Sequence, residues 1–159
     1  MSQNDPVPPS GFGLERVCFI EQHLRLVEQV DDLPDADPNV QFGWDWRITG
    51  DRQFEVILQV QTSPTRRRPE EAAVLLTGQF VARGEGLSVP VVAFVSAQAP
   101  AILLPWAREC ISSLTGRGFF GQFMLPPLNV LTLMSNVDKA AATGARQLAT
   151  EASSHGWAR

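Results

Sequence analysis

The sequence is poor in the residues that most often bind metal ions or carry catalysis. It has two cysteines, Cys18 and Cys110, and two histidines, His23 and His155, in 159 residues. The cysteines lack any CxxC or Cys/His spacing, so we expect no metal site, and a disulfide does not suit a reducing compartment. His23 falls in a predicted strand and His155 in a predicted tail, so neither belongs to a visible Ser/His/Asp set. We interpret both cysteines as small buried apolar residues.

Positive charge and long apolar runs are also scarce. Asp and Glu number 17 against 13 Lys and Arg, which gives a formal net charge of -4 and a pI near 5.1. Nucleic-acid binding draws on a basic face, so this balance argues against a nucleic-acid partner. No run approaches the roughly 20 apolar residues of a membrane helix. The N-terminal residues lack the basic start and apolar core of a signal peptide. We therefore expect a protein that does not insert into a membrane and stays in the cytoplasm.

A single domain is expected from the length, and the 44% content of hydrophobic residues agrees with a globular fold. Residues 1–13 are rich in proline and glycine and predict a disordered arm. Residues 14–137 form the predicted domain. The Ala-rich residues 138–159 predict a flexible or frayed helical tail.

Alternating apolar and polar residues predict four strands in the first half of the chain. The first covers residues 14–27, with Cys18, Ile20, Leu24 and Leu26 on one side and Val17, Phe19, Glu21, His23 and Arg25 on the other. The second has an unusually large apolar face, formed by Val40, Phe42, Trp44, Trp46 and Ile48.

Gly50-Asp51 is a turn signal, so the second strand should form an antiparallel hairpin with a third at residues 54–60. Residues 64–71 predict a polar loop. A fourth strand follows at residues 74–82, where Gly78 is a candidate bulge. The Arg66-Arg67-Arg68 run resembles a phosphate site, but the acidic residues that follow it favour a solvated hairpin loop.

The second half of the chain predicts helices. Residues 103–115 have an apolar arc with the spacing of an amphipathic helix, formed by Leu103, Leu104, Trp106, Ala107, Cys110, Ile111 and Leu114. Pro105 fits such a helix if it lies in the first turn. Residues 91–98 favour a short helix over a strand, and Asn129 should cap a second helix that begins at Val130. Four strands followed by helices predict an α+β domain, with an antiparallel sheet covered by helices on one face.

The connection after the main helix is too apolar for an ordinary surface loop. It contains five large apolar side chains: Phe119, Phe120, Phe123, Met124 and Leu125. Connections normally run over the surface, so we expect these side chains to meet a partner.

The segment Ile102-Leu103-Leu104-Pro105-Trp106-Ala107-Arg108-Glu109-Cys110-Ile111-Ser112-Ser113, with Arg117-Gly118 and Pro127-Leu128-Asn129, closely resembles the signature region of the SecB family of bacterial protein-export chaperones. The resemblance covers about residues 14–136. It implies a four-stranded antiparallel sheet with two helices, and subunits that assemble as a dimer of dimers. It also implies no catalysis and no cofactor. Family members bind unfolded preproteins in apolar grooves and deliver them to the translocase motor SecA.

Carried over to this sequence, the family's groove maps onto Phe42, Trp44 and Trp46 of the second strand, and onto the five apolar side chains of the loop. Glu21 occupies one acidic position of the motor-docking face, but Arg25 and Thr77 stand where further acids are expected. We assign the oligomer interface to Val17, Cys18, Phe19, Leu103, Trp106, Cys110 and Leu114. A SecB-like chaperone that serves another client, such as an antitoxin, is the variant reading.

Three functional hypotheses remain open. The first is an ATP-independent holdase that buries client side chains against a groove of Phe, Trp, Leu and Met. The second is a passive scaffold whose apolar surfaces serve only self-assembly. Against the holdase stands the simpler interpretation that Phe42, Trp44 and Trp46 are only the inner face of a sheet covered by the helix. The third is an enzyme with Cys110 as nucleophile, which its place on the apolar arc disfavours.

Overall fold

The computed structural model describes residues 11–83 and 90–127. The chain divides into two compact units, Met1–Leu125 and Pro126–Arg159, and the fold described here is that of the first. The predicted helix from Val130 with its cap Asn129, the predicted tail 138–159 and residues 1–10 of the predicted arm lie outside the described residues.

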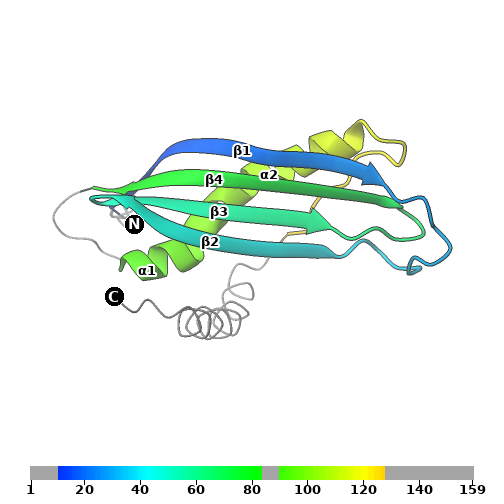
Figure 1. Ribbon diagram of the computed structural model, residues 1–159, viewed down its shortest axis with the longest axis horizontal. Helices are drawn as coiled ribbons and strands as arrows, with labels where there is room; N and C mark the ends of the chain where they lie inside the picture. Colours follow the sequence, from blue (N-terminus) through cyan, green and yellow to red (C-terminus); the bar gives the residue numbers. More distant parts are fainter. Residues whose placement is uncertain (1–10, 84–89, 128–159) are drawn as a thin grey trace, which may run out of the picture. The chain divides into compact units, whose positions relative to one another are not determined.

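The four predicted strands form one antiparallel sheet in the order β1-β4-β3-β2, so β1 and β2 are the edge strands (Figure 1). They are β1 (Phe12–Leu26), β2 (Val40–Gly50), β3 (Gln53–Thr62) and β4 (Glu70–Ala82). The predicted hairpin pairs β2 with β3, with Trp44 opposite Leu58 and Trp46 opposite Val56. Arg52 in its turn has φ of 59°, in the left-handed region that tight hairpin turns use.

Two irregularities in β1 make its predicted faces wrong. The register with β4 shifts once between Leu14 and Arg16 and again between Phe19 and Glu21. Each shift adds one residue to β1, and because side chains alternate with a period of two, the faces exchange at each shift. Val17 therefore packs against the core on the same side as Leu24. Cys18 lies opposite Thr77 on the outer face and is only half-buried, contrary to the expectation for both cysteines.

β4 begins four residues earlier than predicted. Its first two residues pair with the end of β1, Glu70 with Leu26 and Glu71 with Arg25. The long strand β1 thus provides backbone hydrogen-bond partners for Glu70 and Glu71, which we had predicted to lie in a loop.

The predicted bulge at Gly78 is absent. Gly78 pairs with Val17 on one side and Val56 on the other, with no register shift at that point. Its role is in packing, because a Cβ at this position would lie only 2.6 Å from Cδ2 of Leu103. Glycine thus allows the helix to approach the sheet closely.

The helical segment is longer than predicted. It runs through α1 (Val91–Ala93), a π-helical turn η1 (Phe94–Gln98) and α2 (Ala99–Gly116), which confirms the short helix expected at residues 91–98. Pro105 lies inside α2 rather than in its first turn. It is on the exposed side of α2, so the carbonyl that loses its N–H partner there does not lie in the core.

Helix α2 covers one face of the sheet and packs on β4, β3 and β1 (Figure 1). The core lies between these layers and includes Leu76 and Phe80 of β4, Leu103 and Ile111 of α2, all essentially inaccessible to solvent. Phe12 stacks on Phe94 with ring centroids 3.9 Å apart, so residues 12 and 13, which we assigned to the arm, belong to strand β1 and Phe12 packs on the domain.

The segment Val91–Gly116 is long and apolar enough to meet the length and composition criteria for a membrane span, unlike our expectation from the sequence. Core helices of soluble proteins meet the same criteria of length and composition. Here Leu103, Ala107 and Ile111 are fully buried, and α2 packs on the sheet. The segment is therefore part of the domain core.

Candidate binding surface

The chain folds back on α2 after the helix ends, and residues 118–125 form what we call the apolar loop. Two side chains of the last helical turns hold it. The N–H of Phe123 donates to Thr115 Oγ1 at 2.8 Å. The Gln122 side chain donates to Ser112 Oγ. Gly121 has φ of 75°, a left-handed conformation that favours glycine and reverses the chain. The apolar loop is thus attached to the helix at its C-terminal half.

The five large side chains of the apolar loop divide into exposed and buried groups. Phe119 is 93% exposed, Met124 69% and Phe120 41%. Phe123 is half-buried and packs against the core, and Leu125 is 7% exposed within the core itself. Leu125 was predicted to meet clients, and the structure places it in the core instead. The exposed group is thus Phe119, Phe120 and Met124.

The predicted strand part of the groove lies on edge strand β2. Phe42, Trp44 and Trp46 share one face, are half-buried and pack against the margin of the core. Because α2 makes its main sheet contacts with β4, β3 and β1, these three side chains are less completely covered than their neighbours on β3. They are therefore partly core residues and partly surface.

A hollow of about 240 Å³ lies between β1 and α2. Phe19 lines it from β1, and Trp106 and Leu114 line it from α2. All three were predicted to form an oligomer interface. Leu103, assigned to the same interface, is completely buried within its own subunit and has no surface left for a partner. The apolar arc of α2 thus serves mainly the core of the subunit.

Arg68 contacts the apolar loop and was not singled out from the sequence. Its side chain is 14% exposed, and it donates to the carbonyls of Phe120 at 2.7 Å and Gly121 at 2.9 Å in the apolar loop. We interpreted the arginine run as a solvated loop, which holds for Arg66 and Arg67 but not for Arg68. The one signal in the sequence is the Arg68/Glu70 spacing, which places two opposite charges on one side of an extended segment.

The sequence comparison matches the SecB family model, described as preprotein translocase subunit SecB, over residues 24–140. The chain belongs to the SecB family. The family consists of chaperones, which confirms the resemblance and the functional class that we inferred from the α2 segment.

Solved structures show the same fold. A SecB-like chaperone from Mycobacterium tuberculosis, in complex with an antitoxin peptide, matches with a TM-score of 0.57 at 15% identity, over 74% of this chain and 88% of that chain. A protein of unknown function from Streptococcus agalactiae matches with a TM-score of 0.50 at 13% identity, over 73% of this chain and 97% of that one. The predicted α+β architecture of a four-stranded antiparallel sheet and a long helix is confirmed.

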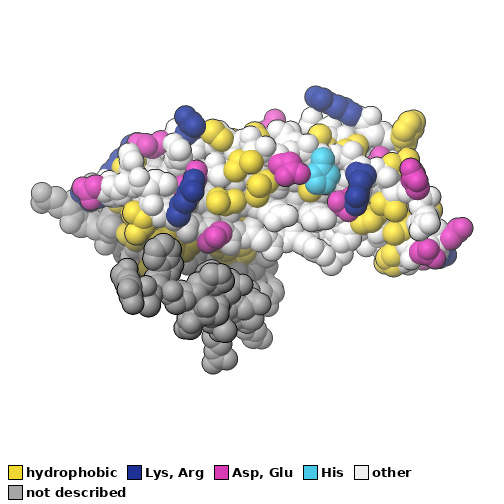
Figure 2. Space-filling model, in the orientation of Figure 1, with side chains coloured by type: hydrophobic (Ala, Val, Ile, Leu, Met, Phe, Trp, Pro, Cys, Tyr) yellow, Lys and Arg dark blue, Asp and Glu magenta, His cyan; other side chains and the backbone are white. Residues whose placement is uncertain are grey.

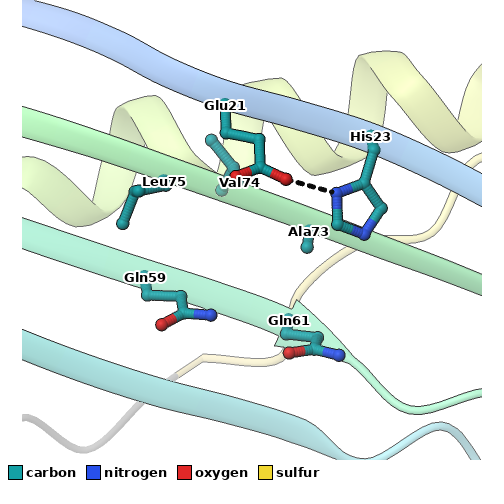
Figure 3. A pocket seen from close by; sticks show the side chains of 7 residues that line it. All are labelled: Glu21, His23, Gln59, Gln61, Ala73, Val74 and Leu75. Carbon is teal, nitrogen blue, oxygen red and sulfur yellow. Dashed lines mark hydrogen bonds and ion pairs between the residues drawn. The ribbon is translucent and has the colours of Figure 1, made fainter.

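The outer face of the sheet, opposite α2, carries the position predicted for motor docking in a SecB family member. Glu21 Oε1 lies 3.2 Å from Nδ1 of His23, beside Gln59 and Gln61 at a hollow of about 100 Å³ (Figure 3). His23 also lies 3.4 Å from Glu71, which pairs with Arg25 at 3.0 Å. Charges of both signs are interspersed on this face rather than gathered into one acidic patch (Figure 2).

Cys110 does not have the surroundings of a nucleophile. Burial, with a smaller contribution from the Glu109 carboxylate, raises the pKa of its thiol above the ordinary value of 9.0. Its Sγ lies 3.2 Å from Gln22 Oε1, to which the thiol donates. A reactive cysteine needs a lowered pKa, so the enzyme hypothesis gains no support here. Within residues 11–83 and 90–127, no group of three or more His, Cys, Asp or Glu is placed to hold a metal ion.

Proposed function

We propose that this SecB family member is an ATP-independent holdase whose apolar loop binds non-native polypeptides. The observation that carries the proposal is the exposure of Phe119, Phe120 and Met124 on a loop that is otherwise anchored to the domain. Contiguous exposed apolar side chains mark interaction sites on soluble proteins. Phe42, Trp44 and Trp46 add a second half-buried apolar surface on β2.

The chemistry of these side chains suits clients of many sequences. Burying one large apolar side chain gains roughly 1.5–3 kcal/mol, without reading the identity of the group that covers it. Aromatic rings add large contact areas, and the flexible thioether of Met124 adapts to different neighbours. No nucleotide is needed for binding of this kind, because the binding energy comes from burial alone.

Two kinds of client fit the proposal. The first is the unfolded preprotein destined for Sec-dependent export, as the family's description suggests. The second is an antitoxin, since the Mycobacterium tuberculosis relative was solved with an antitoxin peptide. The mixed charge of the outer sheet face favours the second, because Glu21 and Glu71 each have a basic or imidazole neighbour. SecA docking through Glu21 belongs only to the first alternative, in which the clients are preproteins for export.

The proposed assembly is an even-numbered homo-oligomer, a tetramer built as a dimer of dimers, in the cytoplasm. Strand β1 is an edge of the sheet within the described residues, so a second copy can pair with it, and Val17, Cys18 and Phe19 lie along it. The hollow bordered by Trp106 and Leu114 supplies further apolar surface near that edge. Cys110 is also among the residues that line the hollow, and it is largely buried.

The test is suppression of aggregation without nucleotide. A chemically unfolded enzyme diluted from guanidinium chloride should scatter less light when this protein is present. A passive scaffold, the competing reading, forms the same oligomer but leaves the scattering unchanged. Equal suppression by an unrelated acidic protein at the same concentration would also contradict the proposal.

A further inference from the structure

Arg68 connects two parts of the chain that are more than fifty residues apart. It lies in the β3–β4 connection, two residues before Glu70, and its guanidinium reaches the apolar loop. Nη2 donates to the carbonyl of Phe120 at 2.7 Å, and Nη1 donates to the carbonyl of Gly121 at 2.9 Å. A planar guanidinium can hold both carbonyls at once because its donors are fixed in a fork.

Glu70 fixes the guanidinium in this position. Its Oε2 lies 2.9 Å from Nη1 of Arg68, and its side chain is only 3% exposed. A carboxylate buried to this extent needs its cation, so Arg68 has little freedom to leave. A Cβ at Gly118 would collide with a carboxylate oxygen of Glu70, so the start of the apolar loop lies directly against this ion pair.

The same guanidinium also covers the ring of Phe123. The Arg68 Cζ lies 5.5 Å from the ring centroid, within the range of a cation–π contact. Arg68 thus holds the carbonyls of Phe120 and Gly121 and also contacts the ring of Phe123 further along the apolar loop. The exposed side chains of Phe119 and Met124 make none of these contacts with Arg68, so the anchoring leaves them available.

We propose that the Arg68–Glu70 ion pair is the positioning device of the client surface: it holds the backbone of the apolar loop so that Phe119, Phe120 and Met124 face clients. The inference rests on the proposed function. A loop already held in its binding conformation loses less conformational freedom when a client arrives, which strengthens binding. Arg68 is therefore a positioning residue and need not touch the client.

The neighbouring Arg67 provides a matched control. It pairs with Asp35 at 2.8 Å, and both side chains are more than half exposed, at 68% and 56%. It has the same charge and lies in the same connection as Arg68. An exposed pair of this kind contributes little to structure.

The experiment compares Arg68→Met/Glu70→Gln, Arg68→Lys and Arg67→Gln with the wild-type protein. The double variant removes the donors without leaving a buried unpaired charge, so it should fold. Arg68→Lys keeps the charge but lacks the fork that holds both carbonyls. For each variant, hydrogen exchange of the peptide spanning residues 117–127 reports the loop, and the dissociation constant for reduced carboxymethylated α-lactalbumin reports client binding.

We expect the double variant to exchange at least tenfold faster across the apolar loop and to bind the unfolded probe about tenfold more weakly. Arg68→Lys should fall between it and the wild type, and Arg67→Gln should match the wild type. A purely structural role would change stability but not the affinity of the folded protein, so unchanged affinity overturns the inference. Unchanged exchange also overturns it. If the wild-type protein binds no probe, the proposed function itself fails, which is a separate and recognisable result.

Discussion

Leu103 of helix α2 lies directly over Gly78 of strand β4, with no room between them for a side chain at position 78. A Cβ there would approach Leu103 Cδ2 to 2.6 Å and Phe80 Cε2 to 2.9 Å. Leu103 and Phe80 are both fully buried, so neither can move aside without disturbing the core. This contact limits how closely the helix approaches the sheet at this point.

Gly78→Ala should therefore destabilise the subunit by about 1–3 kcal/mol, the usual cost of overpacking a core. The free energy of unfolding in urea measures it. Gly43→Ala is the control, because a Cβ at that position of β2 would meet no atom within 4 Å apart from those of its chain neighbours. Equal losses in the two variants would contradict the proposed role of Gly78.

Phe119→Asp/Met124→Asp should weaken client binding about tenfold or more and leave the unfolding transition unchanged, because both side chains are largely exposed. Fluorescence anisotropy with a labelled unfolded chain measures the binding. Val92→Asp removes another exposed apolar side chain, 60% exposed on α1, and is the control. The same loss in Val92→Asp would mean that client binding is not specific to the apolar loop. Phe123 is unsuitable for this test because its ring packs on the core.

The thiol of Cys110 should make folding less favourable at alkaline pH. Its folded-state pKa is raised by burial and by Glu109, so the unfolded chain loses this proton first as pH rises. The contribution to stability is complete below the ordinary thiol pKa of 9.0 and is lost above it, as pH rises through the folded-state pKa. Urea unfolding of the wild type and Cys110→Ala between pH 7 and 10 measures it. If the free energy of unfolding of the wild type falls no more steeply with pH than that of Cys110→Ala, the result counts against this account.

Arg25→Gln should strengthen binding to SecA if the outer sheet face is a weakened docking surface. Arg25 is exposed and pairs with Glu71, so its removal makes this face more acidic. The gain should be larger at low ionic strength, because exposed charges are screened by salt. Surface plasmon resonance with immobilised SecA, at two salt concentrations, measures the affinity of the wild type and of Arg25→Gln. Tight wild-type binding that Arg25→Gln leaves unaltered would show that docking does not use this acidic position.

The regular parts of the fold were predictable from the sequence because their signals are local. The alternation along β2 and β3 predicts both faces of the hairpin, and their pairing confirms it. The same rule is wrong in β1, where two register shifts place Val17 on the helix side and Cys18 on the outer face. The extra residue at each register shift cannot be recognised from the hydrophobic pattern, because apolar residues occur on both faces of this strand.

The binding surface was only partly predictable, for a different reason. A glycine-bearing loop with five large apolar residues stands out in the sequence, but which of them reach solvent depends on distant residues. Leu125 enters the core, and Phe123 lies beneath the guanidinium of Arg68. The contact of Arg68 with Phe120 and Gly121 joins positions more than fifty residues apart, which no local pattern reports.

Native mass spectrometry with an unfolded client tests the central claim most directly, because it reports oligomeric state and occupancy together. We predict an even-numbered oligomer that gains the mass of a client without nucleotide. Phe119→Asp/Met124→Asp should give the same oligomer without the client. A wild-type oligomer that never gains a client, or equal occupancy in the variant, would contradict the account.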